Sequence, residues 1–123
     1  MVSFEGFSAE GGVPIYLQII MYVKRGAVSG AVADGDELPS RRVLSALLGV
    51  NPNTVQKAYR MLEDEGLVQS RSGAKSCMVL DAEKSSRIRS ELTEHDARAA
   101  VTAMKQMGLT REEAKRLIDE YWG

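Results

Sequence analysis

The sequence predicts a mainly α-helical fold with one small β-hairpin: three helices, then the hairpin, then two more helices. Apolar residues recur at helical spacing in five segments, and glycine or proline residues separate these segments. A three-residue, glycine-bearing turn separates the second and third helical segments. The two short strand-like runs both follow the third helical segment, which places a single hairpin there.

The first two helices have clear start and stop signals. The first begins at Pro14 and ends at Gly30, and its apolar side holds Ile15, Ile19, Ile20, Val23 and Ala27. The second has Ser40 as its N-cap and ends at Gly49. Its expected apolar face consists of Val43, Leu44, Leu47 and Leu48.

The third helix follows almost at once, with Asn51 as its N-cap, Pro52 as its first residue and Gly66 after its end. Its buried stripe is expected to hold Val55, Ala58, Tyr59 and Leu62. Two helices joined by so short a turn are typical of a helix-turn-helix.

The strand-like runs cover residues 67–71 and 76–80 and flank a turn at 72–75. A hairpin in this place completes a winged helix-turn-helix domain, predicted for residues 1–80.

Residues 81–123 are predicted to form a two-helix tail, whose second helix begins with a capping box of Thr110 and Glu113. Little chain remains to cover the apolar stripes of these helices, so two tails packed about a two-fold axis would bury them. The expected dimer interface consists of Ile88, Leu92, Leu117, Ile118, Tyr121 and Trp122. In an alternative arrangement, the tail folds back on its own winged helix.

Composition indicates a globular protein, with 44% hydrophobic and 27% charged residues. The single cysteine, Cys77, cannot form an internal disulfide, no signal peptide is recognisable, and no apolar run approaches the ~20 residues of a membrane span. We therefore expect a cytoplasmic protein without a membrane partner. The net charge is −1, yet residues 40–76 hold six basic side chains against three acidic ones. A locally basic surface is compatible with binding to nucleic acid.

The third helix carries polar side chains opposite its apolar stripe: Asn53, Gln56, Lys57 and Arg60. Amides pair with adenine in the major groove, and cations reach guanine or phosphate, so double-stranded DNA is the expected partner. A merely solvated helix face would have a similar composition.

Arginine and lysine also occur beside this helix. Arg41 and Arg42 lie in the first turn of the second helix, where cations oppose the helix dipole, which suggests a phosphate or base partner. An ion pair with Asp36 or Glu37 would also explain them. Arg71 and Lys75 flank the hairpin tip, where Gly73 would allow close approach to a groove, although such tips are often simply basic.

Four segments of the sequence resemble the GntR family of bacterial regulators. The resemblance is carried by PIYLQI (14–19), LPSRRVL (38–44), GVNPNTVQKAY (49–59) and LEDEGLV (62–68). It implies DNA contacts by Arg42, Asn51, Asn53, Thr54, Gln56 and Lys57, with Gly73 at the wing. The family's usual wing tip, Gly-Lys-Gly-Thr, is altered here to Gly-Ala-Lys-Ser at 73–76.

Only 43 residues follow Leu80, too few for the effector-binding domain of most family members. The short tail is similar to that of the YtrA-like subgroup, whose members look like dimeric repressors, often of transporter genes.

The expected function is therefore that of a sequence-specific, homodimeric transcriptional repressor that binds an inverted-repeat operator. No catalytic constellation, metal site or cofactor motif is recognisable, since His95 is the single histidine and nothing around it or Cys77 is activating. Two alternatives stay open: a winged helix that binds only proteins, and a sensor holding a small-molecule effector between tail and wing.

Overall fold

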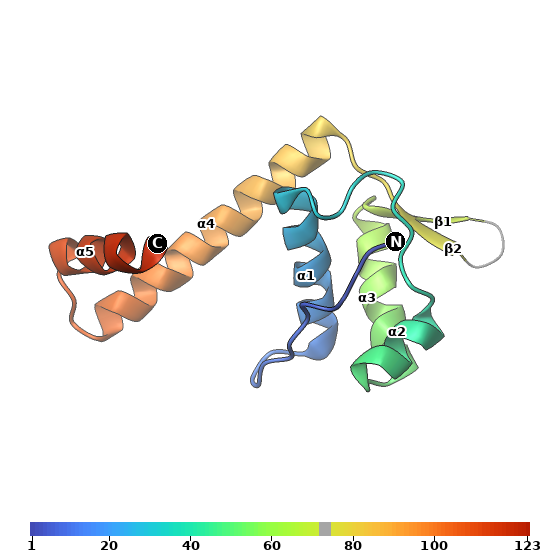
Figure 1. The fold of residues 1–123 in the computed structure, drawn as a ribbon, viewed down its shortest axis with the longest axis horizontal. Coiled ribbons are helices and arrows are strands. Elements are labelled where there is room, and N and C mark those ends of the chain that lie inside the picture. Colours follow the sequence, from blue (N-terminus) through green and yellow to red (C-terminus); the bar gives the residue numbers. More distant parts are fainter. Residues whose placement is uncertain (72–74) are drawn as a thin grey trace. The chain divides into compact units, whose positions relative to one another are not determined.

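The computed structural model describes residues 1–71 and 75–123. These residues form five helices and one hairpin, which confirms the predicted fold class (Figure 1). The elements are α1 (Ile15–Ser29), α2 (Arg41–Leu48), α3 (Pro52–Asp64), β1 (Val68–Arg71), β2 (Lys75–Met78), α4 (Ala82–Gln106) and α5 (Arg111–Trp122). The chain forms two compact units, residues 1–89 and 90–123, so α4 runs through the boundary between them.

The predicted caps set the ends of α2 and α3. Ser40 Oγ accepts a hydrogen bond from the Val43 N–H at 3.1 Å, and Asn51 Oδ1 accepts one from the Asn53 N–H at 2.8 Å. Gly49 ends α2 with φ +68°, a left-handed conformation that glycine adopts without steric cost. Ser40 thus fixes the start of α2, and Gly49 and Asn51 bound the sharp turn between the two helices.

The core of the first unit lies between α1, α2, α3 and the hairpin, with α3 packed against both other helices and β1. The predicted stripe of α3 is buried, and so is that of α1 at Ile19, Ile20, Val23 and Ala27. Burial of this apolar surface is the main force that holds the unit together.

The predicted apolar face of α2 is wrong for two of its four residues. Val43 and Leu47 are 54% and 64% exposed, whereas Leu44 and Ser45 are buried. Compared with the predicted orientation, α2 turns a different side toward the core. On that side Ser45 donates its hydroxyl to the Val50 carbonyl, and Arg41 lies over the Tyr59 ring. Two polar side chains thus find partners on the inner side of α2 and displace apolar residues from it.

The wing contains more than the predicted hairpin. β1 and β2 pair antiparallel, with Val68 opposite Met78 and Arg71 opposite Lys75. On the other edge of β2, the segment before α2 adds a bridge between Glu37 and Cys77. The Leu38 N–H donates to the Ser76 carbonyl and the Met78 N–H to the Asp36 carbonyl, both at 2.8 Å. This segment therefore ties the wing to the start of α2.

The N-terminal arm, residues 1–13, was not predicted to reach the core. Val2 and Phe4 are nevertheless buried, and the Val2 N–H donates to the Glu37 carbonyl at 2.8 Å. The Phe4 ring stacks on Tyr22 of α1 with 5.0 Å between centroids. The arm is thus packed against α1 and attached to the edge of the wing.

The second unit consists of the rest of α4, a turn, and α5. Thr110 and Glu113 form the predicted capping box, in which each side chain accepts a hydrogen bond from the other residue's N–H. Across residues 1–71 and 75–123, none of the helices combines the length and apolar character needed to cross a membrane.

Candidate nucleic-acid interface

The predicted recognition residues lie on α3, on the side away from its buried stripe. Asn53, Lys57 and Arg60 are exposed, and Gln56 and Thr54 are half-buried. Asn51, directly before the helix, is exposed, but its Oδ1 is occupied by the capping hydrogen bond. Asn51 therefore shapes the start of α3 and keeps only its NH₂ group for a further partner.

The two arginines at the start of α2 lie in different environments. Arg42 is exposed, whereas Arg41 is half-buried, with its Cζ 5.5 Å from the centroid of the Tyr59 ring. The Arg41 Nε is buried without a hydrogen-bond partner among the described residues. Within the same residues, neither arginine pairs with Asp36 or Glu37, and Asp36 instead accepts from the Ala33 N–H at 2.9 Å. The ion pairs that offered an alternative explanation for the arginines are thus not formed.

Tyr59 supports this arrangement from the core. Its side chain is 1% exposed, and its hydroxyl donates to the Pro39 carbonyl at 2.7 Å. Burial raises the pKa of the Tyr59 hydroxyl well above its ordinary value, although the nearby Arg41 charge acts in the opposite direction. The sequence pattern placed Tyr59 in the buried stripe, but it gave no sign of the hydrogen bond to the residue preceding the α2 cap.

Lys57 has a partner that sequence reasoning missed. Its Nζ lies 4.0 Å from the centroid of the Tyr16 ring, which belongs to α1. This distance is within the range of a cation–π interaction. The predicted contact residue therefore leans on an aromatic side chain from a different helix.

Ser45 is a second residue that the sequence analysis did not single out. It is buried, its hydroxyl donates to the Val50 carbonyl, and its own carbonyl accepts from the Val50 N–H at 3.1 Å. These two hydrogen bonds close the turn between α2 and α3. Ser45 thereby holds the start of α3 in place relative to α2.

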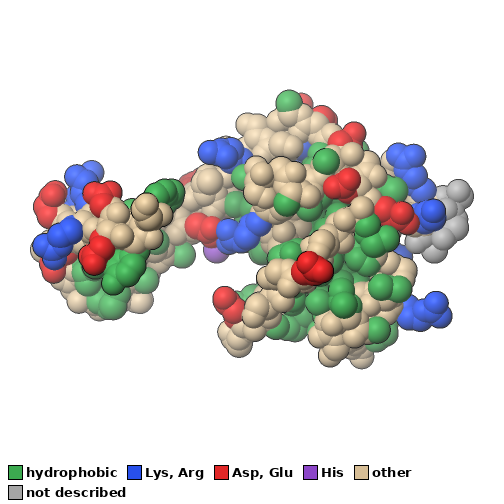
Figure 2. Space-filling model, viewed as in Figure 1, with side chains coloured by type: hydrophobic (Ala, Val, Ile, Leu, Met, Phe, Trp, Pro, Cys, Tyr) green, Lys and Arg blue, Asp and Glu red, His purple; other side chains and the backbone are tan. Residues whose placement is uncertain are grey.

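The hairpin places two cations face to face. Arg71 and Lys75 are register partners at the end of the β-ladder, and both are exposed. Like charges directly opposite each other on a hairpin destabilise it, so an anionic partner would relieve their repulsion. Gly73, the remaining predicted wing residue, lies outside the described residues. Figure 2 shows Lys and Arg side chains along the side of the first unit that carries the hairpin and the start of α2.

The residues predicted for the dimer interface differ in exposure. Ile118, Tyr121 and Trp122 are 45%, 79% and 86% exposed, and Leu117 is half-buried. Ile88 and Leu92 are only 2% and 6% exposed in the single chain and offer a partner little surface. Two further large apolar side chains of the second unit are exposed, Val101 and Met107. The uncovered apolar surface of this unit thus lies toward α5 and the end of α4.

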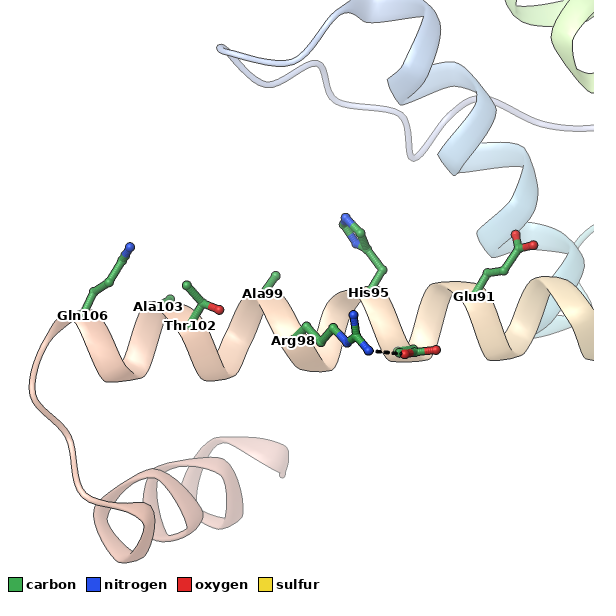
Figure 3. Close-up of a pocket in the computed structure, with 8 residues that line it drawn as sticks. Glu91, His95, Arg98, Ala99, Thr102, Ala103 and Gln106 are labelled. Carbon is green, nitrogen blue, oxygen red and sulfur yellow. Dashed lines mark ion pairs between the residues drawn. The ribbon is translucent and has the colours of Figure 1, made fainter.

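One face of α4 lines an open groove (Figure 3). Charged side chains lie near one end, where Arg98 pairs with Glu94 at 2.7 Å, and the small side chains of Ala99 and Ala103 line the groove beyond them. The His95 Nδ1 lies 3.3 Å from the Oδ1 of the neighbouring Asp96. Among residues 1–71 and 75–123, no group of three or more His, Cys, Asp or Glu side chains is placed to hold a metal ion.

Comparison with known proteins agrees with this geometry. The family model for bacterial regulatory proteins of the gntR family matches residues 15–76, half of the chain. The HTH-type transcriptional regulator YhcF of Bacillus subtilis (strain 168) is 37% identical over 100 residues, covering 81% of this chain and 83% of YhcF. The HTH-type transcriptional repressor YtrA of the same organism is 47% identical over 60 residues, covering 49% of this chain and 46% of YtrA.

A solved structure of a GntR family transcriptional regulator from Listeria monocytogenes aligns with a TM-score of 0.78 at 26% identity. The alignment covers 91% of this chain and 98% of that one. The family match spans α1, α2, α3, β1 and the start of β2, the elements that carry the predicted DNA contacts.

Proposed function

The chain belongs to the GntR family and is a DNA-binding transcriptional regulator rather than an enzyme, and we propose that it is a homodimeric repressor acting on an inverted-repeat operator. Its likeness to the repressor YtrA supports the repressor role. The proposal assigns DNA binding to residues 1–80 and dimerisation to residues 81–123.

The observation that carries the proposal is the exposed polar face of α3, bordered by cations from α2 and the hairpin. We propose that Asn53, Gln56 and Lys57 choose the sequence, because amides pair bidentately with adenine and a cation can reach guanine. The arginines and lysines supply most of the affinity through phosphates, and this contribution weakens as salt rises. The full proposed contact surface consists of Arg41, Arg42, Asn51, Asn53, Thr54, Gln56, Lys57, Arg60, Arg71, Gly73 and Lys75.

The proposed dimer forms through the exposed apolar side chains of the tail. Tyr121 and Trp122 are the proposed anchors, because aromatic side chains contribute most to such interfaces. An interface built from the same patch on both copies has two-fold symmetry. Two-fold symmetry in turn requires two inverted half-sites on the same side of the duplex.

Fluorescence anisotropy tests the proposal directly. The purified protein is titrated into labelled DNA from upstream of its own gene, beside a scrambled fragment, across a salt series. Tight, salt-steep binding that favours the native fragment is expected. Equal weak binding to both fragments calls for selection from a random DNA library. Failure to enrich any sequence there, together with no binding at low salt, would favour the protein-interaction alternative.

The dimer is tested with the selected sequence cut into its two halves. We expect the full inverted repeat to bind much more tightly than either half-site, because two linked contacts reinforce each other. Equal affinity for one half-site and the full repeat would contradict the two-fold arrangement.

We expect the regulator to act in the cytoplasm, where chromosomal DNA is found.

We propose, second, that a small-molecule effector binds the regulator. From the sequence we expected such an effector between tail and wing, whereas the apolar pocket that favours it here lies within the second unit, lined in part by Val101, Met104, Leu109 and Ala114. A compound that raises the melting temperature and also changes operator affinity would support it. No cofactor is part of the proposal.

A further inference from the structure

Lys57 is held by a neighbour before any DNA is bound. Its Nζ lies 4.0 Å from the centroid of the Tyr16 ring, on the adjoining helix α1. Lys57 is exposed, and Tyr16 is half-buried. Within the described part of the chain, Lys57 forms no ion pair, so no carboxylate there neutralises its charge. The cation is therefore both localised and available.

We propose that Tyr16 is a positioning residue for DNA recognition, which holds the Lys57 ammonium at the edge of the polar face of α3. The inference rests on the proposed function, since it assumes that α3 contacts DNA. A ring covers one side of an ammonium group and leaves N–H donors for a phosphate or for guanine O6 and N7. Tyr16 thus guides Lys57 without replacing it.

The benefit to binding is preorganisation. A lysine side chain is long and flexible, and fixing it on DNA costs conformational entropy. Packing against Tyr16 removes part of this freedom in the unbound protein, so less is lost when the complex forms. Tyr16 then contributes to affinity through Lys57, and its contribution vanishes when Lys57 is absent.

The same helix provides a matched control. Tyr22 also belongs to α1, but its ring stacks on Phe4 and its hydroxyl donates to the Ser3 carbonyl at 3.0 Å. Tyr22→Leu makes the same chemical change as Tyr16→Leu and disturbs the N-terminal arm instead of Lys57. A general loss of α1 packing would appear in both variants.

The experiment measures the affinity of each variant for the selected operator. The single variants are Tyr16→Phe, Tyr16→Leu, Tyr22→Leu and Lys57→Met. Two double variants combine Tyr16→Leu or Tyr22→Leu with Lys57→Met. Tyr16→Leu is expected to weaken binding about two- to fivefold, within the cost of ordering one long side chain at an interface. Tyr16→Phe keeps the ring and should bind like the wild type. In the Lys57→Met background, Tyr16→Leu should have no further effect, whereas any effect of Tyr22→Leu should persist.

Two further readouts separate positioning from simple structural damage. If Lys57 contacts a phosphate, Lys57→Met lowers the salt slope by about one, whereas Tyr16→Leu retains the charge and leaves the slope unchanged. In DNA-free protein, the ring current of Tyr16 should shift the Lys57 ε-methylene protons upfield in NMR spectra. This shift should persist in Tyr16→Phe and disappear in Tyr16→Leu.

Independent, multiplicative effects of Tyr16→Leu and Lys57→Met would overturn the inference while the proposed function stands. The absence of the upfield shift in the wild type would also overturn it, as would equal losses in Tyr16→Phe and Tyr16→Leu. A wild-type protein that enriches no DNA sequence would overturn the proposed function and this inference together.

Discussion

Arg41 and Arg42 are adjacent in sequence but face different surroundings. Arg41 lies over the Tyr59 ring and buries its Nε, whereas Arg42 is exposed. Arg41 has fewer donors free for a phosphate than Arg42, because its side chain is half-buried and its Nε is buried. Arg42 is therefore the better reporter of phosphate binding, and Arg41 also serves the packing of α2 on α3.

Substitutions at Arg42 and Gln56 should have different effects on DNA binding. Arg42→Ala should weaken binding to most sequences, because it removes a phosphate contact. Gln56→Ala should instead relax the preference at one base pair by about 1–3 kcal/mol. Affinity measured over a panel of single-base operator variants, with random DNA as the reference, checks both expectations. If both substitutions lower specific and random binding by the same factor, the proposed roles are wrong.

Tyr59→Phe should destabilise the first unit by about 1–3 kcal/mol, because the buried Pro39 carbonyl loses its donor. Chemical denaturation measures this change, and the retained ring preserves the contact with Arg41. Because burial raises the pKa of Tyr59, the folded state favours the neutral hydroxyl. Its stabilising contribution is complete below the unfolded pKa of about 10 and declines as the pH rises above it. The phenylalanine variant should lack this part of the alkaline loss of stability.

Among the elements, those governed by local signals could be predicted from the sequence. The ends of α1, α2 and α3 follow from Pro14, Ser40, Asn51 and the glycines, and the stripe of α3 follows from helical spacing. The third segment of the wing and the docked arm could not be predicted, because both depend on partners distant in the chain. The inner face of α2 was mispredicted for the same reason, since Ser45 and Arg41 are buried by tertiary contacts.

In the candidate site too, features that depend on one helix could be predicted from the sequence, and a contact between helices could not. Side chains such as Asn53, Gln56 and Arg60 could be assigned to one face because they share a single helix. The contact between Tyr16 and Lys57 joins two helices and has no signal in either one. Helical spacing indicates which residues are exposed on a helix, but not which neighbouring element restrains them.

At the start of α5, the pKa of Glu113 should report on whether the capping box is formed. Hydrogen bonds from the Thr110 backbone and side chain hold the pKa of the Glu113 carboxyl below its ordinary value. The cap therefore stabilises α5 above the unfolded pKa of this group and weakens as the pH falls through the folded pKa. In Thr110→Ala, the Glu113 pKa should rise, because the side-chain hydrogen bond is lost. NMR titration of the carboxyl carbon measures the shift, and an unchanged pKa would contradict this account of the cap.

In the whole molecule, the most exposed large apolar side chains of the second unit lie on α5. Tyr121 and Trp122 are 79% and 86% exposed, and no residue of α5 is buried. Contiguous exposed apolar surface of this kind marks interaction sites. The proposed dimer is the arrangement that covers it.

Replacing Tyr121 and Trp122 together by alanine should raise the dimer dissociation constant by about tenfold or more, because large aromatic anchors are lost. Analytical ultracentrifugation over a concentration series measures the change. Leu47→Ala is the matched control, since Leu47 is also an exposed apolar residue, at 64%, but lies on α2. Equal dissociation of both variants, or a monomeric wild type at all concentrations, would count against the tail as the dimer surface.

The attachment of the N-terminal arm has a consequence for how the chain folds during synthesis. The Val2 N–H donates to the Glu37 carbonyl, and Glu37 bridges to Cys77, so a segment synthesised well before β2 is joined to the edge of the wing. The arm cannot acquire its final register until the ribosome has synthesised β2, because β2 fixes the extended segment that receives it. Nascent chains halted before Cys77 should therefore leave the arm undocked and open to proteases, although α1, α2 and α3 have already been synthesised.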